Sequence, residues 1–194
     1  MMGQPAEQAD LFGGALALPE DFVYQPDFIS VAEERELLAG IRQLTLEDAK
    51  YREYTARRRV AYFGFAYDFS ANRLGEAAPV PAFLLPLRAK LARWMGIDAE
   101  RFAHALVNEY RPGTPLGWHR DAPDFDLVAG VSLGGRARMR FRRYPPGKDK
   151  PFALELEPRS AYQLNGASRW RWQHSIPPTP ELRYSITFRT LRKS

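Results

Sequence analysis

The chain has 194 residues, of which 45% are hydrophobic, so it is long enough for one domain with its own core. Lys and Arg outnumber Asp and Glu by 28 to 23, and the resulting net charge of +5 is compatible with a nucleic-acid partner but does not require one. The chain has no cysteine, which excludes disulfides, thiolate metal sites and cysteine nucleophiles.

The N-terminal residues 1–18 are rich in small side chains and lack periodicity, so we expect a loose arm. The chain shows no signal peptide and no apolar run of about 18 residues, so we expect a cytoplasmic protein without a membrane partner. Phe22–Tyr24 and Phe28–Ile29 predict two short extended segments. No internal repeat or long linker follows, which favours a single domain over residues 1–194.

Two amphipathic helices are predicted in the N-terminal half. Ser30 and Glu33 form a capping box that starts the first one. The second lies within 79–96, where Pro86 favours a late start and Gly96 an end. We expect both helices to pack on the outside of a sheet. Their apolar faces consist of Leu37, Leu38, Ile41 and Leu44 in the first helix and Leu84, Leu87, Leu91 and Trp94 in the second.

Between these helices, residues 49–70 mix basic with aromatic side chains. Arginines can contact phosphates, and aromatic rings can stack on an unpaired base. Aromatic strand residues are also common in protein cores, and Arg57 to Arg59 would fit a solvated turn equally well. The residues alone support the binding and the structural interpretation about equally.

From residue 102 onward the pattern indicates strands. In the first of them Phe102, His104, Leu106, Asn108 and Tyr110 share one face, because alternate strand residues point to the same side. His104 has no partner motif, so we interpret it as a hydrogen-bonded sheet histidine and not as a metal ligand.

His119 and Asp121 form a His-x-Asp pair after this strand. If they lie on a strand, their side chains point to one side and can converge on one ion. His174 offers a third ligand. Two histidines and one carboxylate form the facial triad of non-haem iron(II) oxygenases, which leaves positions open for a co-substrate and O₂.

Residues 127–133 predict a buried strand, and the next strand alternates arginines with apolar residues. We expect its apolar side to line the core and its arginines to form a charged outer face or to blunt a sheet edge. The alternative is that a phosphate backbone relieves the repulsion between these like charges. The alternating arginines are Arg136, Arg138, Arg140 and Arg142.

Further short strands are predicted at residues 152–157, 160–164 and 169–176. Asn165-Gly166 is a typical hairpin-turn dipeptide and predicts a turn between the last two. Trp170 and Trp172 precede His174, and we expect them to pack around the metal site.

The last strand alternates so that Arg183 and Arg189 share a face with Ser185. Guanidinium groups match carboxylates, and two of them suit a dicarboxylate such as 2-oxoglutarate. Asn108 and Tyr110 could contribute an amide and a phenol to the same pocket.

Many short strands after two helices indicate a mostly β fold with flanking helices (α+β), built around a double-stranded β-helix, or jelly-roll, core at 102–191. At this point the chain resembles the AlkB family of iron(II)- and 2-oxoglutarate-dependent nucleic-acid dealkylases. The shared motifs are Asn-x-Tyr-x-x-Gly, His-x-Asp, a later His, and Arg-x5-Arg. They are matched by Asn108, Tyr110, Gly113, His119, Asp121, His174, Arg183 and Arg189.

The resemblance implies the same fold, with iron(II) held by His119, Asp121 and His174. It implies that 2-oxoglutarate is the co-substrate. The residues that would bind it are Asn108, Tyr110, Arg183, Arg189 and Ser185, the last standing where many relatives have Asn.

The family also has a nucleotide-recognition lid over the metal, which corresponds here to residues 49–78. The expected reaction is oxidative removal of alkyl groups from bases of DNA or RNA, single-stranded or flipped out of a duplex, by a monomeric enzyme. The expected substrate-binding residues are Tyr54, Arg57, Arg58, Tyr62 and Trp118. Ala122 and Pro123 follow the Asp ligand, so Asp124 comes one position later than the acidic residue with which relatives often read the base.

Two other functions remain open from the sequence. The same chemistry could act on a protein side chain or a small molecule. A nucleic-acid-binding barrel without turnover is a third interpretation, against which the complete ligand set and both arginines argue.

Overall fold

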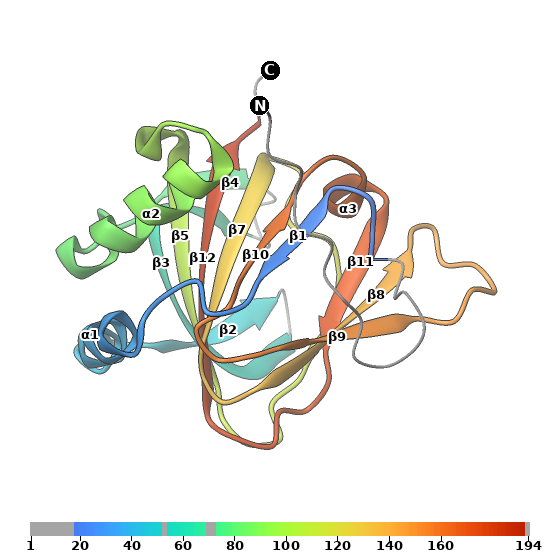
Figure 1. The fold of residues 1–194 in the computed structure, drawn as a ribbon, viewed down its shortest axis with the longest axis horizontal. Helices are drawn as coiled ribbons and strands as arrows, with labels where there is room; N and C mark the ends of the chain where they lie inside the picture. The colour runs from blue at the N-terminus through green and yellow to red at the C-terminus, as the bar shows by residue number, and fades with distance from the viewer. Residues whose placement is uncertain (1–17, 52–53, 69–72, 193–194) are drawn as a thin grey trace, which may run out of the picture.

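The computed structural model describes residues 18–51, 54–68 and 73–192 and consists of two β-sheets with the two longer helices on one side (Figure 1). The predicted N-terminal arm lies almost entirely outside the described residues. The elements are β1 (Phe22–Gln25), α1 (Val31–Ile41), β2 (Glu47–Tyr51), β3 (Tyr54–Asp68), β4 (Arg73–Glu76), the 3₁₀ helix η1 (Ala82–Leu84), α2 (Leu85–Met95), the 3₁₀ helix η2 (Ala99–Arg101), β5 (Phe102–Tyr110), β6 (Leu116–His119), β7 (Phe125–Gly134), β8 (Ala137–Arg143), β9 (Phe152–Leu156), β10 (Ala161–Leu164), α3 (Gly166–Trp170), β11 (Trp172–Ile176) and β12 (Arg183–Leu191).

The larger sheet of the described residues has the strand order β1-β10-β7-β12-β5-β3-β2, with β4 added beside β3. The pairs among β10, β7, β12, β5 and β3 are all antiparallel. The predicted jelly-roll is confirmed, but its large sheet also recruits β1 to β4 from the N-terminal half. The smaller sheet has the order β6-β11-β8-β9.

Both predicted helices cover the outer face of the larger sheet, as expected (Figure 1). The backbone N–H of Ser30 donates to Glu33 Oε2 at 2.7 Å, and Glu33 N–H donates to Ser30 Oγ at 3.1 Å, which confirms the capping box at the start of α1. Pro86 lies in the first turn of α2, and Gly96 ends that helix with a left-handed φ of 65°.

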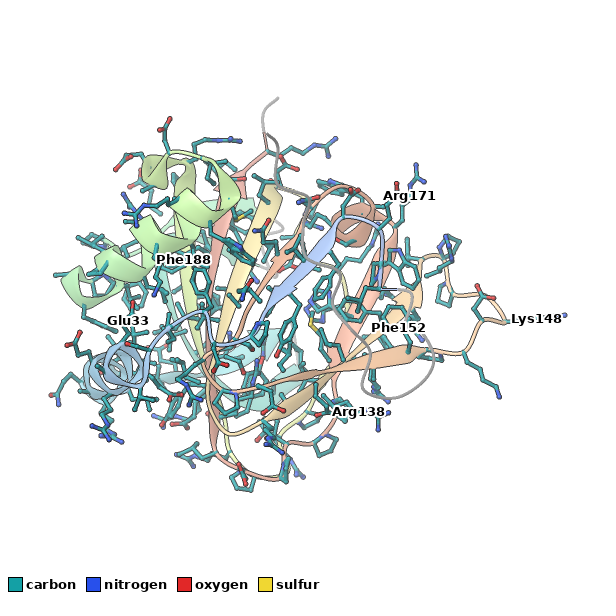
Figure 2. All side chains as sticks on the ribbon, in the orientation of Figure 1. Glu33, Arg138, Lys148, Phe152, Arg171 and Phe188 are labelled. Carbon is teal, nitrogen blue, oxygen red and sulfur yellow. The ribbon has the colours of Figure 1, made fainter. Side chains whose placement is uncertain are left out.

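Two apolar clusters hold these layers together. One joins the helices to the large sheet, and Figure 2 labels Phe188 of β12 within it. The other joins the two sheets around Met139 and Phe141 of β8, which confirms that the apolar side of the arginine strand faces the core. Beside this second cluster, the space between the two sheets contains a cavity. The polar side chains of β5 and β12 line this cavity.

Two local predictions were wrong. Phe28–Ile29 is not a strand but follows the turn after β1. Asn165-Gly166 is not a hairpin turn, because Asn165 caps the short helix α3. The backbone N–H of Asn165 donates to Ser168 Oγ at 3.0 Å, and the helix occupies the chain up to Trp170, so β11 begins only at Trp172. The described residues include no helix long and apolar enough to cross a membrane.

Candidate iron and co-substrate site

The three predicted metal ligands come together between the two sheets. His119 at the end of β6 lies directly opposite His174 on β11 in the antiparallel register, and their ring centroids are 4.2 Å apart. Asp121 does not lie on the strand, contrary to the prediction, because β6 ends at His119. Its Oδ2 is nevertheless 3.8 Å from His174 Nε2. One ligand atom from each residue lies within 4.8 Å of the others.

The two histidines are prepared to act as neutral ligands. The Nδ1 of His119 lies 2.9 Å from the carbonyl oxygen of Gly117, so an Nδ1–H donated to this oxygen leaves Nε2 free to bind a metal. Burial lowers the pKa of His174 to about 3, and burial also lowers the pKa of His119. Both rings are therefore uncharged at neutral pH, each with one nitrogen free of a proton, as metal binding requires.

Asp121 is kept ionised by arginines. Burial alone would raise the pKa of its carboxyl, but the charge of Arg189, with smaller effects from His174 and Arg169, holds the pKa well below its usual range. Arg189 donates to Asp121 Oδ1 from Nε at 2.8 Å and from Nη2 at 2.5 Å. Because Oδ1 is occupied, Oδ2 is the oxygen that faces the histidines and is available to an ion. The donor set of two imidazoles and one carboxylate oxygen fits iron(II).

Arg169, which the sequence analysis did not identify, holds the loop that carries Asp121. It is 2% exposed, and its Nη2 lies 3.3 Å from the carbonyl oxygen of Asp121 and 2.7 Å from those of Ala122 and Phe125. Asp121 and Ala122 lie between β6 and β7, outside any strand, and there the guanidinium supplies bonds that a sheet would otherwise provide. Nothing in the sequence around Arg169 marks it as a buried residue, so the sequence analysis could not have found this role.

Replacing Arg169 with alanine is therefore expected to loosen the Asp121 loop. The carbonyl groups of Asp121, Ala122 and Phe125 would lose this donor, although Ala122 keeps the N–H of Phe125, at a cost of about 3 kcal/mol in the free energy of unfolding. We expect iron(II) affinity to fall by about tenfold to a hundredfold, as when other supporting partners of metal ligands are removed. Denaturant unfolding and anaerobic iron titration measure the two effects. Arg171→Ala, which truncates an exposed arginine two residues later, is the control, and equal iron affinity in both variants would contradict this role.

The five predicted co-substrate residues line one cavity beside the metal ligands: Asn108, Tyr110, Arg183, Ser185 and Arg189. Asn108 accepts a hydrogen bond from Arg58 Nη1 at 3.0 Å and donates to Ser185 Oγ at 3.3 Å. The two arginines are not equivalent, however, since Arg189 contacts Asp121 while Arg183 lies deeper, opposite Tyr110 in the sheet register.

The surroundings of Arg183 indicate whether this cavity fits a dicarboxylate. It is 2% exposed, its Nε donates to Ser132 Oγ at 3.0 Å, and its guanidinium lies 4.9 Å from the Tyr110 ring centroid. Among the described residues it has no carboxylate partner. A buried cation without a counter-charge is costly, so the site calls for an anion, and the distal carboxylate of 2-oxoglutarate meets this need.

Two further polar residues of this cavity were missed by the sequence analysis. Thr187 lies between Ser185 and Arg189 on the same face of β12, so the period-two pattern could have identified it. Tyr162 reaches in from β10, and burial raises its pKa to about 12, so it remains a neutral phenol. Its ring crosses Gly130, where any Cβ would collide with it.

A second cavity of about 340 Å³ opens on the other side of the metal ligands. It shares His119, Asp121 and Arg189 with the iron and co-substrate site, and the rest of its wall is mainly aromatic and aliphatic. Three predicted substrate-binding residues line it: Arg58, Tyr62 and Trp118. The Arg57 side chain is exposed and does not line it, and the Tyr54 side chain lies outside the described part of the structure.

The predicted lid region is largely part of the main sheet. Arg57 to Arg59 lie within β3 and do not form a solvated turn. Arg58 points inward to Asn108, while Arg59 Nη1 lies 3.3 Å from Glu109 Oε1 on the other face. Alternation along one strand therefore gives neighbouring arginines different roles.

His104 also lines the second cavity and is not one of the metal-binding group, as predicted. Its Nδ1 forms a short contact with the carbonyl oxygen of Phe65, which satisfies the ring within the sheet. Burial, assisted by the charge of Arg189, lowers the pKa of His104 to about 3. It is therefore a neutral side chain in the cavity wall.

Comparison with known proteins agrees with this geometry. Residues 21–189 match the family described as the 2OG-Fe(II) oxygenase superfamily. The chain is 31% identical over 194 residues to the Alkylated DNA repair protein ALKBH8 homolog of Arabidopsis thaliana, covering 86% of this chain and 53% of that protein. It is 30% identical to the Probable RNA/DNA demethylase ALKBH6 of Danio rerio, covering 76% of this chain and 60% of the relative. The chain thus spans only about half to three-fifths of these two relatives.

Among solved structures, OsALKBH1 superposes with a TM-score of 0.69 at 15% identity, over 87% of this chain and 97% of that one. At this identity the likeness concerns the fold alone. Together with the relatives above, it confirms the resemblance to the AlkB family that the motifs indicated.

Proposed function

We propose that this chain, which belongs to the 2OG-Fe(II) oxygenase superfamily, removes alkyl groups oxidatively from N-alkylated bases of DNA or RNA. The proposal is supported by the names of its relatives, one a DNA repair protein homolog and one a probable RNA/DNA demethylase. The observation that supports it most strongly is the second cavity, in which aromatic side chains and the buried Arg58 lie next to the metal ligands.

In this proposal His119, Asp121 and His174 hold iron(II), and Arg183 binds the distal carboxylate of 2-oxoglutarate. When bound, iron and 2-oxoglutarate supply, with O₂, the oxidising power that hydroxylates an N-alkyl carbon, while 2-oxoglutarate becomes succinate and CO₂. The hydroxylated alkyl group then leaves the base as an aldehyde. Arg189 keeps Asp121 charged and presents its Oδ2, so the carboxylate geometry does not depend on the ion.

The walls of the second cavity define how a base would be held. A volume of about 340 Å³ is in the range of small-ligand sites and accepts a planar base. Tyr62 and Trp118 offer rings for stacking, and His119 forms the wall next to the metal. Only a base outside a helical stack can enter such a cavity, so the substrate is single-stranded or flipped out of a duplex.

The decisive experiment offers methylated DNA, methylated RNA and a methylated nucleoside side by side, with Fe(II), 2-oxoglutarate and O₂. We expect an unmodified base and an aldehyde to appear in proportion to succinate, and mass spectrometry measures each product. Succinate formation without any change in a base, or turnover of a protein or metabolite in its place, would refute the dealkylase and leave the oxygenase.

A further inference from the structure

We infer that the outer face of the small sheet binds the phosphate groups of the polynucleotide whose base occupies the second cavity. We call this surface the arginine face and define it by Trp118 of β6, Arg120 directly after β6, and Arg140 and Arg142 of β8. The inference rests on the proposed function, since it specifies which surface follows the strand outside the cavity.

The four alternating arginines fall into two pairs with different partners: Arg136, just before β8, with Arg138, and Arg140 with Arg142. Arg136 Nε lies 2.8 Å from Glu157 Oε2, and Arg138 Nε lies 3.7 Å from Glu155 Oε1. These glutamates lie on or next to β9, so they neutralise one end of the arginine strand.

The other end of the strand retains its charge. Arg140 Nε donates to Ser175 Oγ at 3.1 Å, and Arg142 Nε donates to Gln173 Oε1 at 2.8 Å. Both partners are neutral, and neither arginine has a carboxylate within ion-pair distance in the described ranges. Two positive charges therefore remain side by side on one strand, as expected for a surface that binds an anion.

The indole of Trp118 positions these two guanidinium groups. Their central carbons lie 5.0 Å and 4.5 Å from the Trp118 ring centroid, for Arg140 and Arg142 respectively. Cation–π contact and the Nε hydrogen bonds fix the two planes. The Nη groups remain without an acceptor within residues 18–51, 54–68 and 73–192. Oriented donors of this kind match the oxygens of a phosphate.

The arginine face is continuous with the cavity, because Trp118 and Arg120 line the cavity as well. Arg120 is exposed, and its guanidinium lies 3.8 Å from the Tyr144 ring centroid. A base held in the cavity would leave its own phosphates at this rim. Alternate strand residues are about 7 Å apart, a spacing on the order of that between neighbouring phosphates in an extended strand.

The loop after β8 adds two exposed lysines, with the exposed Asp149 between them, for a net charge of +1 over these three residues. Figure 2 shows Lys148 at the tip of the loop between β8 and β9, which projects from the body of the molecule. Lys150 is exposed in the same loop. Arginines stacked on aromatic rings favour a polynucleotide over an acidic protein, because the same surface can hold phosphates and pack against sugars and bases.

The test measures binding of an unmodified single-stranded oligonucleotide by fluorescence anisotropy at several salt concentrations. For the double variant Arg140→Gln/Arg142→Gln we expect about tenfold weaker binding and a slope of log affinity against log salt that is smaller by about 1.4, or about 0.7 for each lost phosphate contact. The matched control is Arg136→Gln/Arg138→Gln, which removes the same charge from the same strand and should leave the slope unchanged. Thermal melting confirms that both variants fold.

The possible results distinguish a failure of the arginine face from a failure of the proposed dealkylase function. Wild-type binding with an unchanged slope in Arg140→Gln/Arg142→Gln would overturn the arginine face and leave the dealkylase proposal standing. Weaker binding without a change of slope would also overturn it, since it would indicate a structural role. If the wild type binds no oligonucleotide at low salt, or binds polyglutamate equally well, the arginine face is overturned, while the dealkylase proposal is decided by its own turnover assay.

Discussion

A variant carrying His174→Ala is expected to form almost no succinate, with a loss of about a thousandfold or more in turnover of 2-oxoglutarate. The remaining donors would be one imidazole and one carboxylate, which cannot hold iron(II) in the facial arrangement. No other His, Asp or Glu of the described residues belongs to this metal-binding group, so none can replace His174. Succinate measured by mass spectrometry, with Fe(II) supplied in excess, tests this expectation.

His104→Ala is the matched control for this variant, because it removes the one histidine of the chain that is not a proposed metal ligand. It lines the second cavity outside the metal-binding group, so we expect its iron(II) affinity to equal that of the wild type. If His174→Ala kept its iron affinity and its succinate production, the assignment of the three ligands would be wrong.

The Arg183→Met variant is expected to lose affinity for 2-oxoglutarate while the stability of its fold stays nearly unchanged. Affinity for 2-oxoglutarate should fall by about a hundredfold, in the range measured when one partner of a buried charge pair is truncated. The free energy of unfolding of the protein without 2-oxoglutarate should change by no more than about 1 kcal/mol. In the described structure the buried Arg183 has no carboxylate partner. Replacing this cation with an apolar side chain of similar length therefore removes little stabilising interaction.

Calorimetric titration with 2-oxoglutarate and denaturant unfolding measure the two quantities for Arg183→Met. Arg183→Lys, which keeps the charge but not the planar fork, should bind with intermediate affinity. A strongly destabilised Arg183→Met protein that still binds 2-oxoglutarate normally would mean that the arginine supports the fold and not the co-substrate.

Much of this site could be predicted because its signals are local. The alternation from Arg183 to Arg189 places both arginines on one face of β12 without knowledge of any other strand. Asn108 and Tyr110 follow from the same rule on β5. The pairing of these two strands then brings the two faces into one cavity, with Asn108 opposite Ser185.

Features that depend on distant partners could not be predicted. Asp121 lies beyond the end of its strand and is positioned by Arg169, which is 48 residues away in sequence. Asn165-Gly166 has the composition of a hairpin turn, but Ser168 completes a helix cap there. The local preference of the dipeptide was thus overridden by its neighbours.

The arginines of β8 show the same limit. Their alternation predicted a charged face, which the structure confirms. The sequence pattern alone could not show that glutamates pair with the arginines at one end of this face and not at the other. Glutamates reach Arg136 and Arg138 only because β9 pairs with β8 in a register that sets Glu155 opposite Arg138. Register is a tertiary property, so the charge that remains at Arg140 and Arg142 is visible only in the structure.

The most direct measurement is a crystal structure grown without oxygen in the presence of Mn(II) and 2-oxoglutarate. Our account requires one ion bound by His119, Asp121 Oδ2 and His174, with the distal carboxylate of 2-oxoglutarate hydrogen-bonded to Arg183. An ion bound elsewhere, or a dicarboxylate that leaves Arg183 unpaired, would contradict it.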